Sequence, residues 1–282
     1  MTVTHPKLGW VLWAGTVGFN SPLGDRFAAA ARAGYDRVTL SPPEVLRAVA
    51  DGTPAQTLGA QARDLGLELI VDPVMNWYPD STVSPSRFAG VTTEDALGVC
   101  EALGAVSLSA IGTGASDVPL SALAEHFAAV CDRAWDFGAE VHLEFIPFTA
   151  IRTIAIGWDI VRDADRPNGG LVFDTWHFFR GDPDYATLAT VPGERILQVQ
   201  IDDASAVPTG TLREETQRRL LPGDGELDLI GALRALDAIG GLRWIGPEVI
   251  SPEVSGLPID DAAALALERS RAVVAAAAGT AG

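Results

Sequence analysis

The sequence predicts one α/β domain, a (β/α)8 TIM barrel that spans residues 1–282. Short apolar runs alternate with longer amphipathic runs rich in Ala and Leu, which is typical of repeated strand–helix units. There are eight such units, and about 35 residues for each unit is the length expected of one step in a closed eightfold barrel. The composition does not shift along the chain in a way that would mark a linker between two domains.

The predicted strands are short and largely apolar, as expected of parallel strands covered by helices. They lie at residues 10–13, 37–40, 67–71, 105–111, 141–145, 171–173, 196–201 and 244–249. A run with helical periodicity follows each strand. These runs lie at residues 23–33, 53–65, 93–103, 120–138, 150–163, 184–190, 229–239 and 260–278. Two long loops, 76–91 and 202–225, follow strands and are expected to cover the face where barrels build their active sites.

Several helix boundaries carry local signals. Thr93 is a candidate N-cap, because two acidic residues follow it in the first turn. A glycine lies at the end of each of the first four predicted helices, where it adopts a left-handed conformation at little cost; these are Gly34, Gly66, Gly104 and Gly138. An open doubly wound sheet is the alternative fold. It would need a glycine-rich phosphate turn after an early strand, and the candidate segments GTGASD and PGDG do not match that pattern.

The charged residues exclude several functions. The 20 basic and 37 acidic residues give a net charge of −17, which repels polyanions, so no binding to nucleic acid is expected. Lys7 is the only lysine, and it lies in a polar N-terminal segment. A Schiff-base enzyme needs a desolvated lysine and a phosphate-binding P-loop needs one on its phosphates, so neither chemistry is expected.

Nothing in the sequence points to secretion or to a membrane. The N-terminus lacks a basic segment followed by a long apolar one, and no stretch reaches about 18 uninterrupted apolar residues. Cys100 and Cys131 belong to no CxxC pair and lie in predicted helices, so they are expected to be reduced thiols of the core. The sequence therefore predicts a soluble, cytoplasmic protein.

Four predicted strands in the second half of the chain end on a side chain that can bind metal. These side chains are Glu144, Asp174, Gln200 and Glu248, and each belongs to a different strand–helix unit. The C-terminal ends of barrel strands meet at one face, so the four side chains should converge. Converging carboxylates repel one another and lose hydration, which a divalent cation relieves. A single acidic residue at a strand end is more often a helix cap or an ion-pair partner, but four side chains that can bind metal, three of them acidic, in consecutive units favour a metal site.

The second half of the chain resembles a known superfamily. The strand ends just named, the DTWH segment at residues 174–177 and the RRLLPGDGELDL segment at residues 218–229 are similar to those of the xylose-isomerase-like sugar phosphate isomerases and epimerases. The first half shares only the strand–helix rhythm. The resemblance implies that Glu144, Asp174, Gln200 and Glu248 hold one divalent ion. It also implies that His177 and Arg219 contact a small, sugar-like substrate, and it leaves a homo-oligomer open.

The residue types indicate how such a site would work. Its all-oxygen ligands suit Mn²⁺ or Mg²⁺ better than zinc, with Co²⁺ as a third candidate. The ion would polarise a carbonyl and stabilise an enediolate. Glu144 and Glu248 would move the proton next to that carbonyl, which describes an isomerase or epimerase of a hydroxy-carbonyl compound. His177 can act as acid, base or hydrogen-bond donor, and Trp13 and Trp176 are candidates for the wall against a sugar ring.

Three other functions are weighed against this one. If a β-hydroxyl leaves instead of a proton returning, the same site is a dehydratase of a keto-polyol or a cyclic keto-acid. Gln200 stands where relatives most often have histidine, a pattern that the resemblance associates with 3-dehydroshikimate dehydratases. A metal-dependent endonuclease of this fold would need many histidines and a basic groove, and the chain has four histidines. A non-catalytic binding barrel is the fourth alternative.

Overall fold

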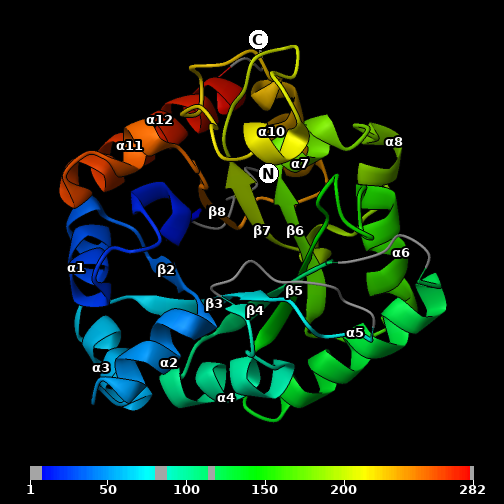
Figure 1. The fold of residues 1–282 in the computed structure, drawn as a ribbon. Coiled ribbons are helices and arrows are strands. Elements are labelled where there is room, and N and C mark those ends of the chain that lie inside the picture. Colours follow the sequence, from blue (N-terminus) through cyan, green and yellow to red (C-terminus); the bar gives the residue numbers. More distant parts are fainter. Residues whose placement is uncertain (1–7, 80–87, 114–117, 280–282) are drawn as a thin grey trace, which may run out of the picture.

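The protein is a closed barrel of eight parallel strands surrounded by helices (Figure 1), as predicted. A computed structural model describes residues 8–79, 88–113 and 118–279. The strands are β1 Gly9–Leu12, β2 Arg37–Leu40, β3 Glu68–Val74, β4 Ser107–Ile111, β5 Glu140–Glu144, β6 Gly169–Asp174, β7 Ile196–Ile201 and β8 Trp244–Pro247. Each strand pairs with the next one in the chain, and β8 pairs with β1, so the sheet has no free edge.

A helix follows each strand at the predicted place. The eight are α1 Leu23–Ala33, α3 Ala55–Asp64, α4 Thr93–Leu103, α5 Leu120–Trp135, α6 Ile154–Ala164, α8 Tyr185–Leu188, α10 Leu229–Ala238 and α12 Ile259–Ala278. Gly34 and Gly104 have positive φ at the ends of α1 and α4, as their position after a helix predicted. The cap of α4 is one residue earlier than predicted, because the side chain of Thr92, not Thr93, accepts a hydrogen bond from the Asp95 backbone N–H.

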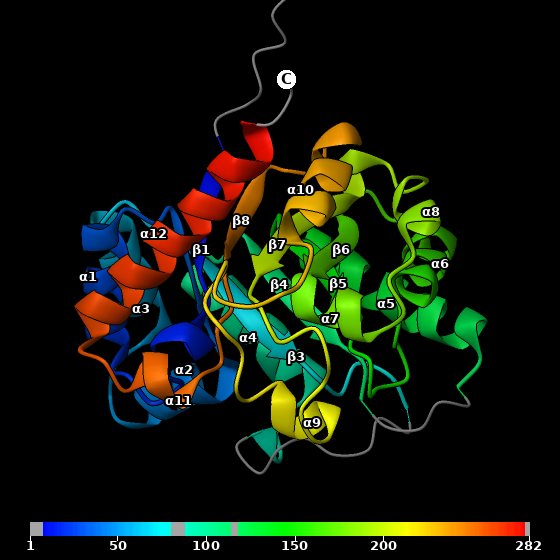
Figure 2. The same ribbon diagram turned by 90° about the horizontal axis from the view of Figure 1, so that it is seen from above.

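Four further α-helices in the described residues were not predicted: α2 Pro42–Ala50, α7 Thr175–Arg180, α9 Leu212–Glu215 and α11 Pro252–Ser255. A signal for α2 is present, since Ser41 and Glu44 form a capping box around two prolines that can begin a helix. In α7 the helix starts directly at the end of β6, with no loop between them. Figure 2 shows α9 and α11 at one end of the barrel and the end of α12 at the other. Part of the predicted loop 76–91 lies outside the described residues.

The apolar core lies mainly between the strands and the helices, and the inside of the barrel is more polar. His142 on β5 is fully buried, and so are Ser109 on β4 and Gln198 on β7. Burial lowers the pKa of His142, while Glu140 works in the opposite direction. The imidazole therefore favours its neutral form inside the barrel, one pleat below Glu144. No helix in the described part of the chain has the length and apolar character needed to cross a membrane.

Both cysteines are expected to be unreactive in the native protein. Cys100 and Cys131 are fully buried, and burial raises the pKa of each thiol to about 12. The thiolate is the reactive form, so iodoacetamide at about pH 8 should label neither residue in the folded protein and both in guanidinium chloride. Mass spectrometry of the labelled chain checks this result. Rapid labelling without denaturant would contradict the burial of these thiols.

Candidate metal and active site

Three predicted metal ligands and His177 meet at the C-terminal ends of the strands. Glu144, Asp174, His177 and Glu248 each offer a ligand atom, and these atoms all lie within 4.8 Å of one another. They come from β5, from the end of β6, from α7 and from the residue that follows β8. All four residues are buried, so their charges are largely removed from water.

Asp174 organises one side of this cluster. It is the last residue of β6 and also the N-cap of α7, where its Oδ1 accepts a hydrogen bond of 2.7 Å from the backbone N–H of His177. This cap places His177 in the first turn of α7. The Nε2 of His177 then lies 3.0 Å from Oε1 of Glu144. The DTWH segment thus links β6 to the carboxylate at the end of β5.

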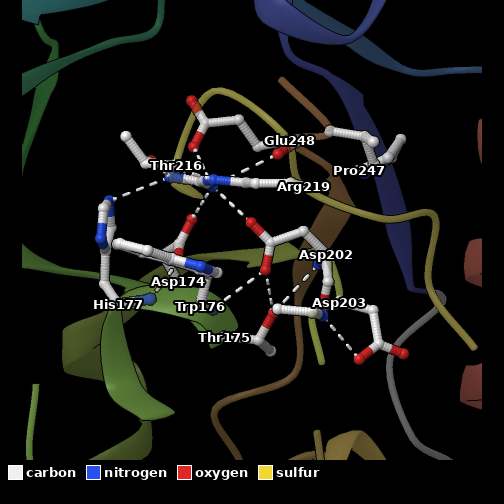
Figure 3. A network of polar contacts seen from close by, with 12 residues as sticks. Asp174, Thr175, Trp176, His177, Asp202, Asp203, Thr216, Arg219, Pro247 and Glu248 are labelled. Carbon is white, nitrogen blue, oxygen red and sulfur yellow. Dashed lines mark hydrogen bonds and ion pairs between the residues drawn. The ribbon is translucent and has the colours of Figure 1, made fainter. Parts of the chain in front are cut away.

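Arg219 lies at the centre of the carboxylates (Figure 3). Its Nη1 donates to Asp174 Oδ2 at 2.7 Å and to Glu248 Oε2 at 2.9 Å, and it also contacts Asp202. The guanidinium therefore bridges two of the predicted metal ligands. Only 2% of the Arg219 side chain is exposed, so these ion pairs are buried.

The remaining donors of Arg219 also have partners. Its Nε and Nη2 donate to the hydroxyl of Thr216 at 3.3 and 3.0 Å. Its Nη2 lies 3.3 Å from Nε2 of His177, and the guanidinium lies 5.4 Å from the ring centre of Trp176. Every nitrogen of the Arg219 guanidinium thus has a protein partner.

The carboxylates differ in their affinity for protons. Burial raises the pKa of Glu248 well above its usual range, and the charges of Glu144 and Asp174 raise it further. Burial and the neighbouring Asp174 raise the pKa of Asp202 to about 7. Burial would raise the pKa of Asp174 as well, but Arg219 and His177 outweigh it, so this pKa is lowered. The metal-free site therefore keeps a negative charge on Asp174 and tends to hold protons on Glu248 and Asp202.

A divalent cation fits the donors at this site. Three buried carboxylates face one another, and a single guanidinium is the counter-charge that reaches Asp174 and Glu248 together. Carboxylate oxygens are hard ligands, and His177 adds a nitrogen that zinc and similar metals accept. Glu144, Asp174 and Glu248, with His177 or Gln200, are thus the residues that would hold the ion.

Gln200 lies beside this cluster, and Trp13 positions it. The two residues make good hydrogen bonds when the Gln200 amide nitrogen faces Asp174 Oδ2 at 3.2 Å and its oxygen accepts from the Trp13 indole at 2.7 Å. Binding a cation would require the opposite orientation, with the amide oxygen toward the carboxylates. The role of Gln200 as a metal ligand therefore stays a prediction.

The site opens into a cavity of about 160 Å³. Glu144, His177, Arg219 and Glu248 line it, whereas Trp13 and Trp176 are fully buried and lie behind it. Trp13 supports Gln200, and Trp176 packs edge-on against His177 and Phe148. A direct contact of either tryptophan with substrate stays a prediction. The ring of Phe148 lines the cavity in their place.

Sequence reasoning missed two acidic residues of the site. Asp72, in β3, lines the cavity, and its charge contributes to the raised pKa of Glu248. Asp202, directly after β7, is fully buried and accepts hydrogen bonds from the hydroxyl of Thr175 and the backbone of Trp176. An aspartate in the apolar run LIVDPV was the available signal for Asp72. The partners of Asp202 come from α7 and from Arg219, and the linear sequence does not show those contacts.

The barrel and the buried acidic site at its C-terminal end define an enzyme of a TIM-barrel superfamily. Residues 27–273 match the family model described as xylose isomerase-like TIM barrel, so the chain belongs to this family. The predicted superfamily and fold are confirmed.

Curated relatives fall into two activities. The chain is 34% identical over 153 residues to an inosose isomerase of Bacillus velezensis, an alignment that covers 54% of each chain. It is 29% identical over 249 residues to a 3-dehydroshikimate dehydratase of Pseudomonas aeruginosa, which covers 86% of this chain and 38% of that protein. The chain thus spans about half the length of the inosose isomerase and less of the dehydratase.

Solved structures share the fold. A crystal structure of the IOLI protein with a zinc atom bound superposes with a TM-score of 0.82 and 21% identity, and covers 95% of this chain and 99% of that one. A D-psicose 3-epimerase from Clostridium cellulolyticum H10 superposes with a TM-score of 0.70 and 17% identity, and covers 95% of this chain and 99% of that one. At these identities the likeness shows the fold alone.

Proposed function

We propose that the protein is a divalent-metal-dependent isomerase or epimerase that moves a proton next to the carbonyl of a sugar-like hydroxy-carbonyl compound. The observation that carries the proposal is the meeting of Glu144, Asp174, His177 and Glu248 beside a cavity of about 160 Å³. The inosose isomerases among the relatives support the same class of reaction. Mn²⁺ or Mg²⁺ suits the carboxylate donors. A cytoplasmic location and a homo-oligomer stay predictions.

Two glutamates with different surroundings divide the proton transfers between them. When bound, a divalent ion polarises the substrate carbonyl and makes the neighbouring C–H more acidic. Glu144 Oε1 lies 3.0 Å from Nε2 of His177 and is the candidate base. Glu248 belongs to the same cluster of ligand atoms and is the candidate group that returns a proton to the substrate. His177 contacts both Glu144 and Arg219, so it can orient the base.

Incorporation of deuterium from solvent tests this function. The metal-loaded protein, incubated with inosose or a ketose in heavy water, should exchange the hydrogen next to the carbonyl and release a product of the same mass apart from deuterium. Nuclear magnetic resonance and mass spectrometry report both changes. A chain that binds manganese or magnesium but exchanges no hydrogen in any hydroxy-ketone would contradict the proposal.

A dehydratase is the second candidate. Two observations favour it: Gln200 at the end of β7 and the alignment of 86% of the chain with a 3-dehydroshikimate dehydratase. In that reaction the base removes the same kind of proton, but a hydroxyl group leaves as water. An unsaturated product that absorbs in the ultraviolet, together with loss of water from the substrate mass, would identify the dehydratase and reject the isomerase.

Metal binding is expected to release protons and to strengthen as the pH rises. The raised pKa of Glu248 favours a protonated carboxyl in the metal-free site, and a metal ligand must be deprotonated. Raising the pH removes that proton in advance, so the apparent affinity should increase. Calorimetric titration with Mn²⁺ in two buffers of different ionisation enthalpy counts the protons released. An affinity that does not change with pH would contradict a ligand role for Glu248.

A further inference from the structure

We infer that the substrate of this site is an uncharged polyhydroxy ketone and that the site excludes carboxylates and phosphates. The inference rests on the proposed function and narrows its substrate class. It comes from the charges and hydrogen-bond donors around the cavity. These favour neutral compounds such as inosose over anionic compounds such as 3-dehydroshikimate.

The first step concerns the one cation that lines the cavity. Among the described residues that line it, Arg219 is the single lysine or arginine. Enzymes that bind a carboxylate or a phosphate usually offer it a guanidinium fork with free N–H groups. Here Nη1 is bound to Asp174, Asp202 and Glu248, and Nε and Nη2 are bound to Thr216. Asp202 and Thr216 are not among the predicted metal ligands, so they can hold Arg219 when an ion is bound, and an anion would have to break the buried Asp202 pair to use it, which is costly.

The next step concerns the arginines close to the cavity. Arg213 stacks on the ring of Phe148 at 4.6 Å and also donates to the Phe148 carbonyl oxygen at 3.4 Å. Arg180 forms two hydrogen bonds of 2.8 Å with the buried Glu215. Neither arginine lines the cavity. Arg180 is thus paired with Glu215, and Arg213 is held beside Phe148 outside the lining of the cavity.

The carboxylates make the surroundings of the cavity negative. Five of them gather here against one guanidinium: Asp72, Glu144, Asp174, Asp202 and Glu248. If Asp202 keeps its proton and a divalent ion deprotonates Glu248, four carboxylates still exceed the charge of the guanidinium and the ion by one. Like charges repel strongly where water is excluded. Hydroxyl groups, in contrast, donate readily to carboxylates. This balance favours a neutral polyol over an anion.

Asp72 is the cavity carboxylate that we assign to accept hydrogen bonds from the substrate's hydroxyl groups. It lines the cavity from β3, on the far side of the barrel from Asp174, and it is close enough to Glu248 to raise the pKa of that carboxyl. The apolar residues Phe19, Ile111 and Ile250 line the same cavity.

The experiment compares matched ketones with the full-length, Mn²⁺-loaded protein. Deuterium incorporation is measured for inosose and D-fructose, which are neutral, and for 3-dehydroshikimate and fructose 6-phosphate, which are anionic. We expect at least one neutral ketone to exchange with a kcat/KM at least about 100-fold above both anionic ones. Faster exchange of an anionic ketone would overturn the inference and leave the proposed reaction standing. Exchange in none of the four, with manganese bound, would overturn the proposed reaction itself.

The variant Asp72→Asn adds a second readout. Loss of a charge-assisted hydrogen bond should weaken binding of the neutral ketone and raise its KM by about tenfold. Loss of the negative charge should raise the exchange rate of the anionic ketones relative to that of the neutral ketone. The control is Asp25→Asn, which removes the same charge from the exposed start of α1 and should leave the ratio unchanged. An unchanged ratio in Asp72→Asn would show that Asp72 does not select substrates by charge and would overturn its assigned role.

Discussion

The Glu144→Gln variant should lose divalent-metal binding and hydrogen exchange together. Glu144 offers one of the ligand atoms that lie within 4.8 Å of one another, and its Oε1 lies 3.0 Å from Nε2 of His177. An amide keeps the shape of the side chain but supplies neither the charge nor the base. Loss of a residue that only hydrogen-bonds to a metal ligand lowers metal affinity by about 10- to 100-fold. Glu144 is itself a predicted ligand, so we expect a larger fall in affinity. Calorimetric titration with Mn²⁺ and Mg²⁺ measures this change.

Glu140→Gln is the matched control for that variant. Glu140 begins the same strand, and 39% of its side chain is exposed near His142, two pleats away from the site. Its replacement should leave metal affinity and exchange within about twofold of the parent values, because surface charges act weakly through water. Retained metal affinity in Glu144→Gln would place the ion elsewhere and reject Glu144 as a ligand.

The Arg219→Met variant should strongly destabilise the metal-free protein. Without the guanidinium, Asp174, Asp202 and Glu248 lose their shared buried counter-charge. Removing one partner of a buried ion pair costs about 3–5 kcal/mol of the free energy of unfolding. A divalent ion supplies positive charge to the same carboxylates, so Mg²⁺ should restore part of this loss. Urea denaturation with EDTA and with Mg²⁺ measures both effects.

Arg32→Met serves as the control for Arg219→Met. Arg32 pairs with Asp260 on the surface, and more than half of each side chain is exposed. Its loss should cost less than about 1 kcal/mol of the free energy of unfolding.

The pH dependence of stability gives a further check. The pKa of Asp174 is lowered from 3.8 in the folded protein, so the stabilisation from its charge is present above pH 3.8 and is lost as the pH falls below 3.8. A loss of under about 1 kcal/mol for Arg219→Met at neutral pH would show that these carboxylates do not depend on Arg219.

The barrel was predictable because its signal is repeated. Alternation of apolar and amphipathic runs occurs eight times, so an error at one boundary does not change the count. The helix α2 escaped detection because its signal is local and occurs once, in the segment SPPE. The helix α7 escaped because it is short and begins within the DTWH motif, which was interpreted for its chemistry alone.

The site was predictable only in part. Strand ends must converge in a closed barrel, and this rule correctly placed Glu144, Asp174 and Glu248 together. Arg219 was expected to contact the substrate, but the sequence gives no sign that three carboxylates share its Nη1. The orientation of Gln200 toward Trp13 depends on a hydrogen bond between β7 and the end of β1. Such contacts are set by side-chain geometry, which spacing along the chain does not encode.

The two oxygens of Asp174 explain why β6 ends on the shorter of the two acidic residues. Oδ1 caps α7, and Oδ2 meets Arg219. A glutamate has the same charge, but its extra methylene would carry the carboxylate away from the first turn of α7. Glu144 and Glu248 are free of this requirement, because no helix begins at either residue. At Asp174 the choice of aspartate is thus governed by a strand that runs straight into a helix, as well as by what the acid binds.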